Sequence, residues 1–201
     1  MIEASRHFWP LLALGLLLAG SAPRLSAHSA NLAGATLKVE PDGRFKLTLE
    51  FSALAFLLND LPERIPDSDL REAANGPVAS LEAMIANGRE RMRRSLTVES
   101  DGNPVGTRLI AFPPAAVLSP PRDRGPVSPL FYAHLEEAIA VGQLPPGKHR
   151  VTVRFPEVIG TVVFTADLPK QEATVEAVTS GDPSHPVEIV TAGSTRAPLG
   201  L

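Results

Sequence analysis

The chain has 201 residues, with 19 Lys and Arg against 22 Asp and Glu, a formal net charge of −3 at pH 7 and no cysteine. This mildly acidic balance lacks the positive charge with which a dedicated nucleic-acid-binding protein neutralises phosphates. The absence of cysteine excludes disulfides, thiol catalysis, zinc–thiolate sites and a lipid attached through cysteine.

The N-terminal segment, residues 1–27, has the pattern of a secretory signal peptide. An apolar run, Leu11–Leu18, is followed by small and polar residues that end at Ala27. The run is shorter than the roughly 20 residues that cross a bilayer as a helix. We therefore predict cleavage after Ala27, an extracytoplasmic location in the periplasm or outside the cell, and no transmembrane segment after removal of the signal. An uncleaved anchor is the alternative interpretation.

The mature chain is predicted to begin with a β-hairpin. Residues 32–40 precede a Pro-Asp-Gly-Arg turn signal at 41–44, and apolar and polar residues then alternate from Phe45 to Phe51. Alternation with a period of two indicates a strand with one buried face. The next segment, 53–58, is apolar on all sides, and we expect a short buried helix or turn there.

A helical insertion is predicted around residues 67–94. Gly76-Pro77 is typical of a helix start, and the apolar residues after it recur at helical spacing: Val78, Leu81, Met84, Ile85 and Met92. Acidic residues in 67–72 suit the beginning of a shorter helix before it. The basic end, residues 89–94, is interpreted as a solvated surface, with contact to anionic lipid or a partner as the alternative.

Two further hairpins are predicted after the helical insertion. Residues 96–99 and 105–112 flank an Asp-Gly-Asn turn and predict the second hairpin. Residues 130–141 and 151–155 flank the proline-containing turn 144–147 and predict the third.

The remaining segments complete a mainly β plan. A proline-rich stretch, 113–129, predicts a solvated surface loop without core residues, with a recognition segment as the alternative. Three more strands are expected at 160–166, 172–178 and 187–191. About seven to nine short strands separated by turns predict an antiparallel, Ig-like β-sandwich. We expect a single domain over residues 28–191 and a flexible tail over residues 192–201.

The candidate metal site depends on the predicted cleavage. His28 would become the N-terminal residue, whose amine and imidazole together can chelate Cu(II) or Ni(II). A second imidazole is needed, and the candidates are His134, His149 and His185. The predicted third hairpin separates His134 from His149 by roughly 26 Å, so the two cannot bind one metal. His28 would therefore bind metal with one of these two histidines at most, together with carboxylates such as Glu136 or Glu137, and we assign His28 and His134 as the candidate ligands. A frayed terminus and solvated histidines are the alternative.

No catalytic motif is present in the sequence. It contains no G-x-S-x-G, no HExxH and no Walker loop. Glu136 and Glu137 are adjacent in a predicted strand, so they face opposite sides and cannot act as a catalytic pair. Aromatic residues make up only 5% of the chain, which disfavours a stacking platform for sugars or single-stranded DNA.

These observations favour a non-enzymatic binding or accessory module at the bacterial cell envelope. Its partner would be an unknown protein or envelope component and not a nucleic acid, and it would need no cofactor. The alternative is a periplasmic protein that binds copper or nickel through His28.

Several segments carry a family resemblance: Ala27-His28, the turn at 41–44, the apolar residues 54–58, Leu144-Pro145-Pro146-Gly147, and residues 154–160. In these segments the chain resembles the extracytoplasmic N-terminal region of HupE/UreJ-like bacterial membrane proteins, over about residues 28 to 190. The resemblance implies a fold and an extracytoplasmic compartment. That family is linked with nickel handling for hydrogenase or urease through a polytopic membrane domain. This chain ends at Leu201 without such a domain, so we do not expect the resemblance to extend to transport.

Overall fold

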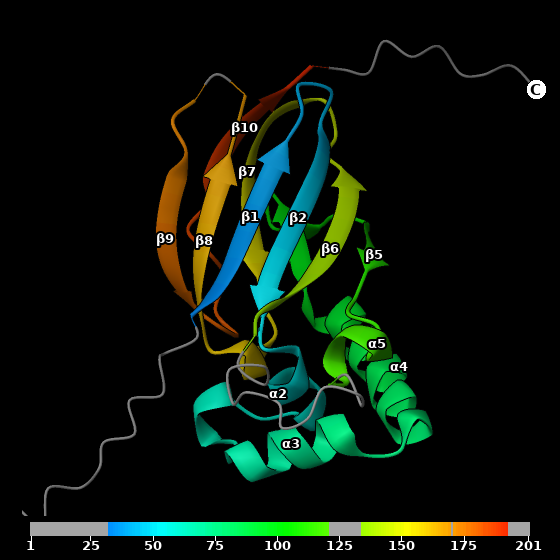
Figure 1. The fold of residues 1–201 in the computed structure, drawn as a ribbon. Coiled ribbons are helices and arrows are strands. Elements are labelled where there is room, and N and C mark those ends of the chain that lie inside the picture. Colours follow the sequence, from blue (N-terminus) through cyan, green and yellow to red (C-terminus); the bar gives the residue numbers. More distant parts are fainter. Residues whose placement is uncertain (1–31, 121–133, 170, 193–201) are drawn as a thin grey trace, which may run out of the picture. The chain divides into compact units, whose positions relative to one another are not determined.

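Residues 32–120, 134–169 and 171–192 are described by the computed structural model, and Figure 1 shows their fold. Within these ranges the strands form two sheets. The larger sheet contains β1 (Ala33–Val39), β2 (Arg44–Phe51), β5 (Thr107–Ala111), β6 (Glu136–Gln143), β8 (Thr161–Asp167) and β9 (Thr174–Thr179). The smaller sheet contains β3 (Thr97–Ser100), β4 (Asn103–Pro104), β7 (Gly147–Arg154) and β10 (Val187–Thr191). The strand orders are β5-β6-β2-β1-β8-β9 and β10-β7-β3-β4.

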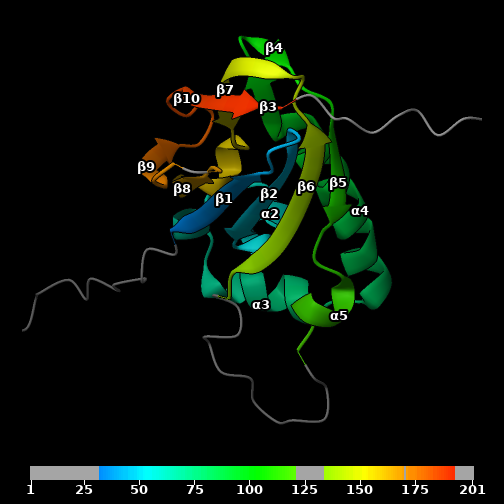
Figure 2. The ribbon, with the colours of Figure 1, turned by 90° about the horizontal axis from the view of Figure 1, so that it is seen from above.

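The hydrophobic core lies between the sheets and continues among the helices. Figure 2 shows the four-stranded sheet on one side of the six-stranded sheet. Buried and exposed residues alternate along β1, β2 and β8, as a sheet with one covered face requires. The inward residues of both sheets belong to one buried cluster, which includes Leu37, Leu47, Leu49, Val153, Phe164 and Ile189. Burial of this apolar surface is the main contribution to stability.

The larger sheet is mixed, which corrects the prediction of a purely antiparallel Ig-like sandwich. Strand β1 pairs antiparallel with β2 and parallel with β8, where Gly34 lies opposite Val163. The strand-rich plan with two sheets and a helical segment is confirmed. Period-two alternation shows which face of a strand is buried, but it carries no information on the direction of the neighbouring strand.

The first predicted hairpin is confirmed, and the second is confirmed only in part. Strands β1 and β2 pair around residues 40–43. Strands β3 and β4 pair around Asp101 and Gly102, whose φ angles of 52° and 78° suit the tight turn that Asp-Gly favours. The predicted partner strand 105–112 divides, however, because β5 leaves the smaller sheet and pairs with β6 in the larger one.

The predicted third hairpin is wrong. Strand β6 pairs with β2 and β5, whereas β7 pairs with β3 and β10 in the other sheet. The segment 144–146 therefore passes from one sheet to the other. Leu144 is 1% exposed, and its N–H donates to the carbonyl of Gly43 at 2.9 Å. Burial of Leu144 anchors this connection in the core, where a hairpin turn would have exposed it.

The helices lie at one end of the sheets in Figure 1. They are α2 (Ala53–Leu58), α3 (Asp67–Asn75), α4 (Val78–Ser95) and the short α5 (Ala115–Leu118), with 3₁₀ turns η1 (Pro62–Arg64) and η3 (Glu157–Ile159). The buried α2 confirms the expectation for 53–58, and α3 with α4 confirms the helical insertion. No helix in the described ranges is long and apolar enough to span a membrane.

Two expectations about the helical end need correction. Leu118 of α5 is 3% exposed, so the described part of the proline-rich stretch does contribute to the core. The basic end of α4 is not uniformly solvated, because the Arg91 guanidinium lies 4.5 Å from the centre of the Phe56 ring and donates to the Phe56 carbonyl. Arg93 and Arg94, in contrast, are exposed and pair with Glu90.

Candidate functional site

The structure does not assemble the predicted metal ligands. His28 and the predicted signal peptide lie outside the described residues. His134 is exposed just before β6, where burial raises the pKa of Glu136 and the nearby His134 opposes that rise. Within the described ranges, no group of three or more His, Asp or Glu side chains is arranged to hold a metal ion. The pairing of His28 with His134 stays a prediction.

The other two described histidines each join a carboxylate. His149 Nδ1 lies 2.8 Å from Oδ2 of Asp101, and this contact raises the pKa of His149. Asp101 Oδ1 accepts the Arg150 N–H at 2.9 Å; this bond, together with His149, lowers the pKa of Asp101. His185 contacts Glu176 through its ring and its backbone N–H. Both histidines therefore hold neighbouring segments together.

A more informative feature is the face of the six-stranded sheet that points away from the smaller sheet, here called the outward face. The described part of the chain leaves this face uncovered. The strand register brings Lys38 of β1, Lys46 of β2, Val141 of β6 and Arg108 of β5 directly side by side. We call these four residues the cationic row. It crosses four neighbouring strands that the sequence separates by up to about a hundred positions.

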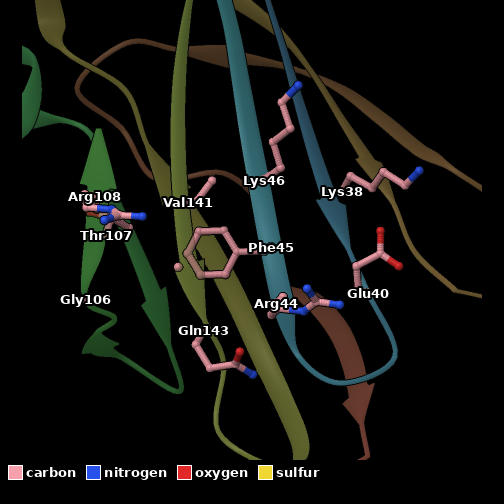
Figure 3. Close-up of a pocket in the computed structure, with 11 residues that line it drawn as sticks. Lys38, Glu40, Arg44, Phe45, Lys46, Gly106, Thr107, Arg108, Val141 and Gln143 are labelled. Atoms are coloured by element: carbon pink, nitrogen blue, oxygen red, sulfur yellow. The ribbon is translucent and has the colours of Figure 1, made fainter. Parts of the chain in front are cut away.

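The cationic row lies in an open groove of about 1030 Å³. Figure 3 shows the side chains of Lys38, Lys46 and Arg108 coming from three different strands around it. The remaining lining residues include Glu40, Arg44, Phe45, Gly142 and Gln143. Cations therefore outnumber acids in the lining by four to one, counting Lys38, Arg44, Lys46 and Arg108 against Glu40.

The buried face of the sheet beneath the groove depends on a glycine. The ring of Phe45 lies so close to Gly142 that a Cβ there would be 2.4 Å from Cζ of the ring and 2.7 Å from the carbonyl oxygen of Gly106. No real side chain tolerates such distances, so Gly142 allows β6 to approach the Phe45 ring.

The three charged side chains of the cationic row form no ion pair within the described residues. Arg44 pairs with Asp42 at 2.7 Å, but no ion pair there involves Lys38, Lys46 or Arg108. Asp167 of β8 lies opposite Lys38 without forming one. Lys38 and Lys46 are direct cross-strand neighbours, an arrangement of like charges that destabilises a sheet. Where a sequence departs from a local stability rule in this way, a functional role is the expected reason.

Two further rows continue along the outward face. The uncharged row consists of Val175, Thr165, Thr36, Thr48 and Ile139, which are neighbours across β9, β8, β1, β2 and β6. The acidic row consists of Glu50 and Glu137, again direct cross-strand neighbours of like charge. Glu137 points outward while Glu136 lies opposite the buried Phe51, which confirms that these adjacent glutamates face opposite sides.

The outward face was not predicted from the sequence. The polar positions at 38 and 46 were visible as the exposed half of an alternating pattern. Their proximity to Arg108 was not visible in the sequence pattern. It depends on the pairing of β5 with β6, and the predicted second and third hairpins gave these two strands other partners.

Comparison of the chain with models of protein families, with curated proteins and with solved structures finds no match. Function is therefore inferred from the geometry and charge of the outward face.

Proposed function

We propose that the protein is a non-enzymatic binding module, exported to the cell envelope, that binds an acidic protein surface on its outward face. The observation that carries this proposal is the cationic row, in which Lys38, Lys46 and Arg108 form no ion pair with described residues. Like charges gathered in a groove concentrate the electrostatic potential and attract a partner of opposite charge. The exported location rests on the signal pattern and on the resemblance to the HupE/UreJ-like region.

The dimensions of the cationic row favour a protein partner. Neighbouring strands are about 4.8 Å apart, so the row from β1 to β5 extends over about 14 Å. A single phosphate or carboxylate would contact only part of this row, whereas several carboxylates on a folded surface or an extended segment can follow its length. The adjoining uncharged row offers methyl and hydroxyl groups, which suit the mixed character of protein interfaces.

Nuclear magnetic resonance of the isotope-labelled protein tests this proposal with a synthetic peptide of alternating Glu and Ser residues as the probe. We expect chemical-shift changes at the backbone amides of Lys38, Lys46 and Arg108, and we expect them to weaken with added sodium chloride because salt screens exposed charges. The double variant Lys46→Glu, Arg108→Glu should lose the response.

The matched control is Lys148→Glu, which changes an exposed lysine on the smaller sheet and should leave peptide binding intact. Shift changes spread over other surfaces, or a response that survives in the double variant, would contradict the proposal.

A further inference from the structure

The three rows of the outward face form a charge pattern with a definite order. The uncharged row lies between the cationic row on one side and the acidic row on the other. On β2 this order is Lys46, Thr48 and Glu50, all on the same face. Successive residues on one face of a strand are about 6.8 Å apart, so Lys46 and Glu50 are separated by roughly 14 Å. The two charges are therefore too far apart to pair within one chain.

The acidic row is as uncompensated as the cationic row. No ion pair among the described residues involves Glu50 or Glu137. Exchanging one charge between the rows would place opposite charges across each strand pair and stabilise the sheet. The chain instead places Lys38, Lys46 and Arg108 at one end of the face, with Asp167 at the β8 side of the same row, and Glu50 and Glu137 at the other end.

Such a pattern is complementary to itself. Consider a second copy placed face to face, related by a two-fold axis that runs along the uncharged row through Thr48. The rotation places β2 over β2 of the other copy and exchanges the two ends of the face. Lys46 of each copy then faces Glu50 of the other, and Glu137 faces the part of the cationic row around Val141 and Arg108. A closed two-fold interface requires this kind of self-complementarity.

We infer that the acidic surface bound by the outward face is the outward face of a second copy of this chain. This inference rests on the proposed function, since it names the partner of the same surface. Each contact forms twice around the axis, and the uncharged rows of the two copies meet at its centre. Because the axis runs across the strands, β2 of one copy lies antiparallel to β2 of the other.

The size of the face predicts a weak dimer. Six strands span about 24 Å and five residues along a strand span about 17 Å, so each copy contributes roughly 400 Å². Stable interfaces bury about 800 Å² per partner, which places this contact among the transient ones. Association should therefore depend on protein concentration and decrease with ionic strength.

Analytical ultracentrifugation of the purified full chain tests the inference. At low salt the wild-type protein should show a reversible monomer–dimer equilibrium that shifts to monomer in high salt. Lys46→Glu alone and Glu50→Lys alone should each weaken self-association on the order of tenfold or more, because each creates two repulsive contacts around the axis. An equimolar mixture of the two variants should associate again, since every repulsive contact becomes attractive in the mixed dimer.

The equimolar mixture of the Lys46→Glu and Glu50→Lys proteins distinguishes the face-to-face dimer from any other mode of association. Lys148→Glu should associate like the wild type. Association that is insensitive to both single variants, or a mixture that stays monomeric when the wild type dimerises, overturns the inference. A monomeric wild type that still binds the Glu-Ser peptide through Lys46 overturns the inference and leaves the proposed function standing. A monomeric wild type that binds no peptide overturns both.

Discussion

The outward faces of the two sheets arrange their charges in opposite ways. On the smaller sheet, Arg150 lies directly opposite Glu188, and Lys148 Nζ is 2.8 Å from the Glu188 carboxylate. Lys148, and secondarily Arg150, lower the pKa of Glu188. On the larger sheet Lys38 lies opposite Lys46 and Glu50 lies opposite Glu137.

This difference is the reason for proposing the larger sheet, and not the smaller one, as the binding surface. A hollow of about 450 Å³ on the smaller sheet mixes acids with arginines, and its Arg154 donates to the carbonyl of Gly181. Lys148 and Glu188, which pair within the chain, would gain little from an outside partner, whereas the like-charge rows of the larger sheet would gain a partner's opposite charges. Three predictions test the comparison, beginning with the largest expected effect.

Of the two glycines that line the groove of the larger sheet, Gly142 should be far more sensitive to added volume than Gly106. Gly142→Ala places a methyl group 2.4 Å from the Phe45 ring, and we expect it to lower the free energy of unfolding by about 1–3 kcal/mol. Urea denaturation followed by circular dichroism measures this change. Gly106→Ala is the matched control, because a Cβ at Gly106 meets no atom within 4 Å. Equal effects of the two substitutions would show that the close approach of Phe45 is not a constraint.

Charge reversal should have opposite effects on the two faces. Lys46→Glu replaces a like-charge neighbour of Lys38 with an opposite one, so it should raise the free energy of unfolding of the monomer by about 0.2–1 kcal/mol. Glu188→Lys should lower stability, because it removes the partner of Lys148 and Arg150. Calorimetry at dilute concentration measures both, and added salt should reduce both differences. If Lys46→Glu and Glu188→Lys changed the free energy of unfolding in the same direction, the two faces would not differ in how their charges affect stability.

If Lys46→Glu stabilises the chain while weakening its association, stability and binding conflict at this residue. Such a conflict is the expected consequence of a surface maintained for binding.

The smallest expected effect concerns the His149–Asp101 contact of the smaller sheet. The raised pKa of His149 means that its contribution is fully present below about pH 6.5 and is lost as the pH rises through the folded-state value. The lowered pKa of Asp101 means that its contribution is present above about pH 4 and is lost as the pH falls. The stability difference between wild type and His149→Gln should therefore be largest between these limits. Melting temperatures across pH 4–8 measure it, with Asp101→Asn expected to give the same profile. A stability difference between wild type and His149→Gln that is constant with pH would show that it does not arise from the His149–Asp101 contact.

Local features were predictable wherever a pattern within one segment carried the information. The alternation from Phe45 to Phe51, the all-apolar segment 53–58 and the helical spacing after Gly76-Pro77 each led to the observed element. Predictions failed where the pairing partner was distant. The third hairpin was wrong because Leu144 is buried as the chain crosses between sheets, and nothing in residues 144–147 distinguishes such a crossing from a turn.

By itself, the sequence determined the strand-rich composition, the buried face of most strands and the helical segment, because side-chain periodicity and turn chemistry act over a few neighbouring residues. Only the tertiary structure decided that β1 lies parallel to β8 and that β5 joins β6. Those pairings place Lys38, Lys46 and Arg108 in one row. The physical reason is that strand order and register are settled by burial across the whole core, between segments that the chain separates by many residues.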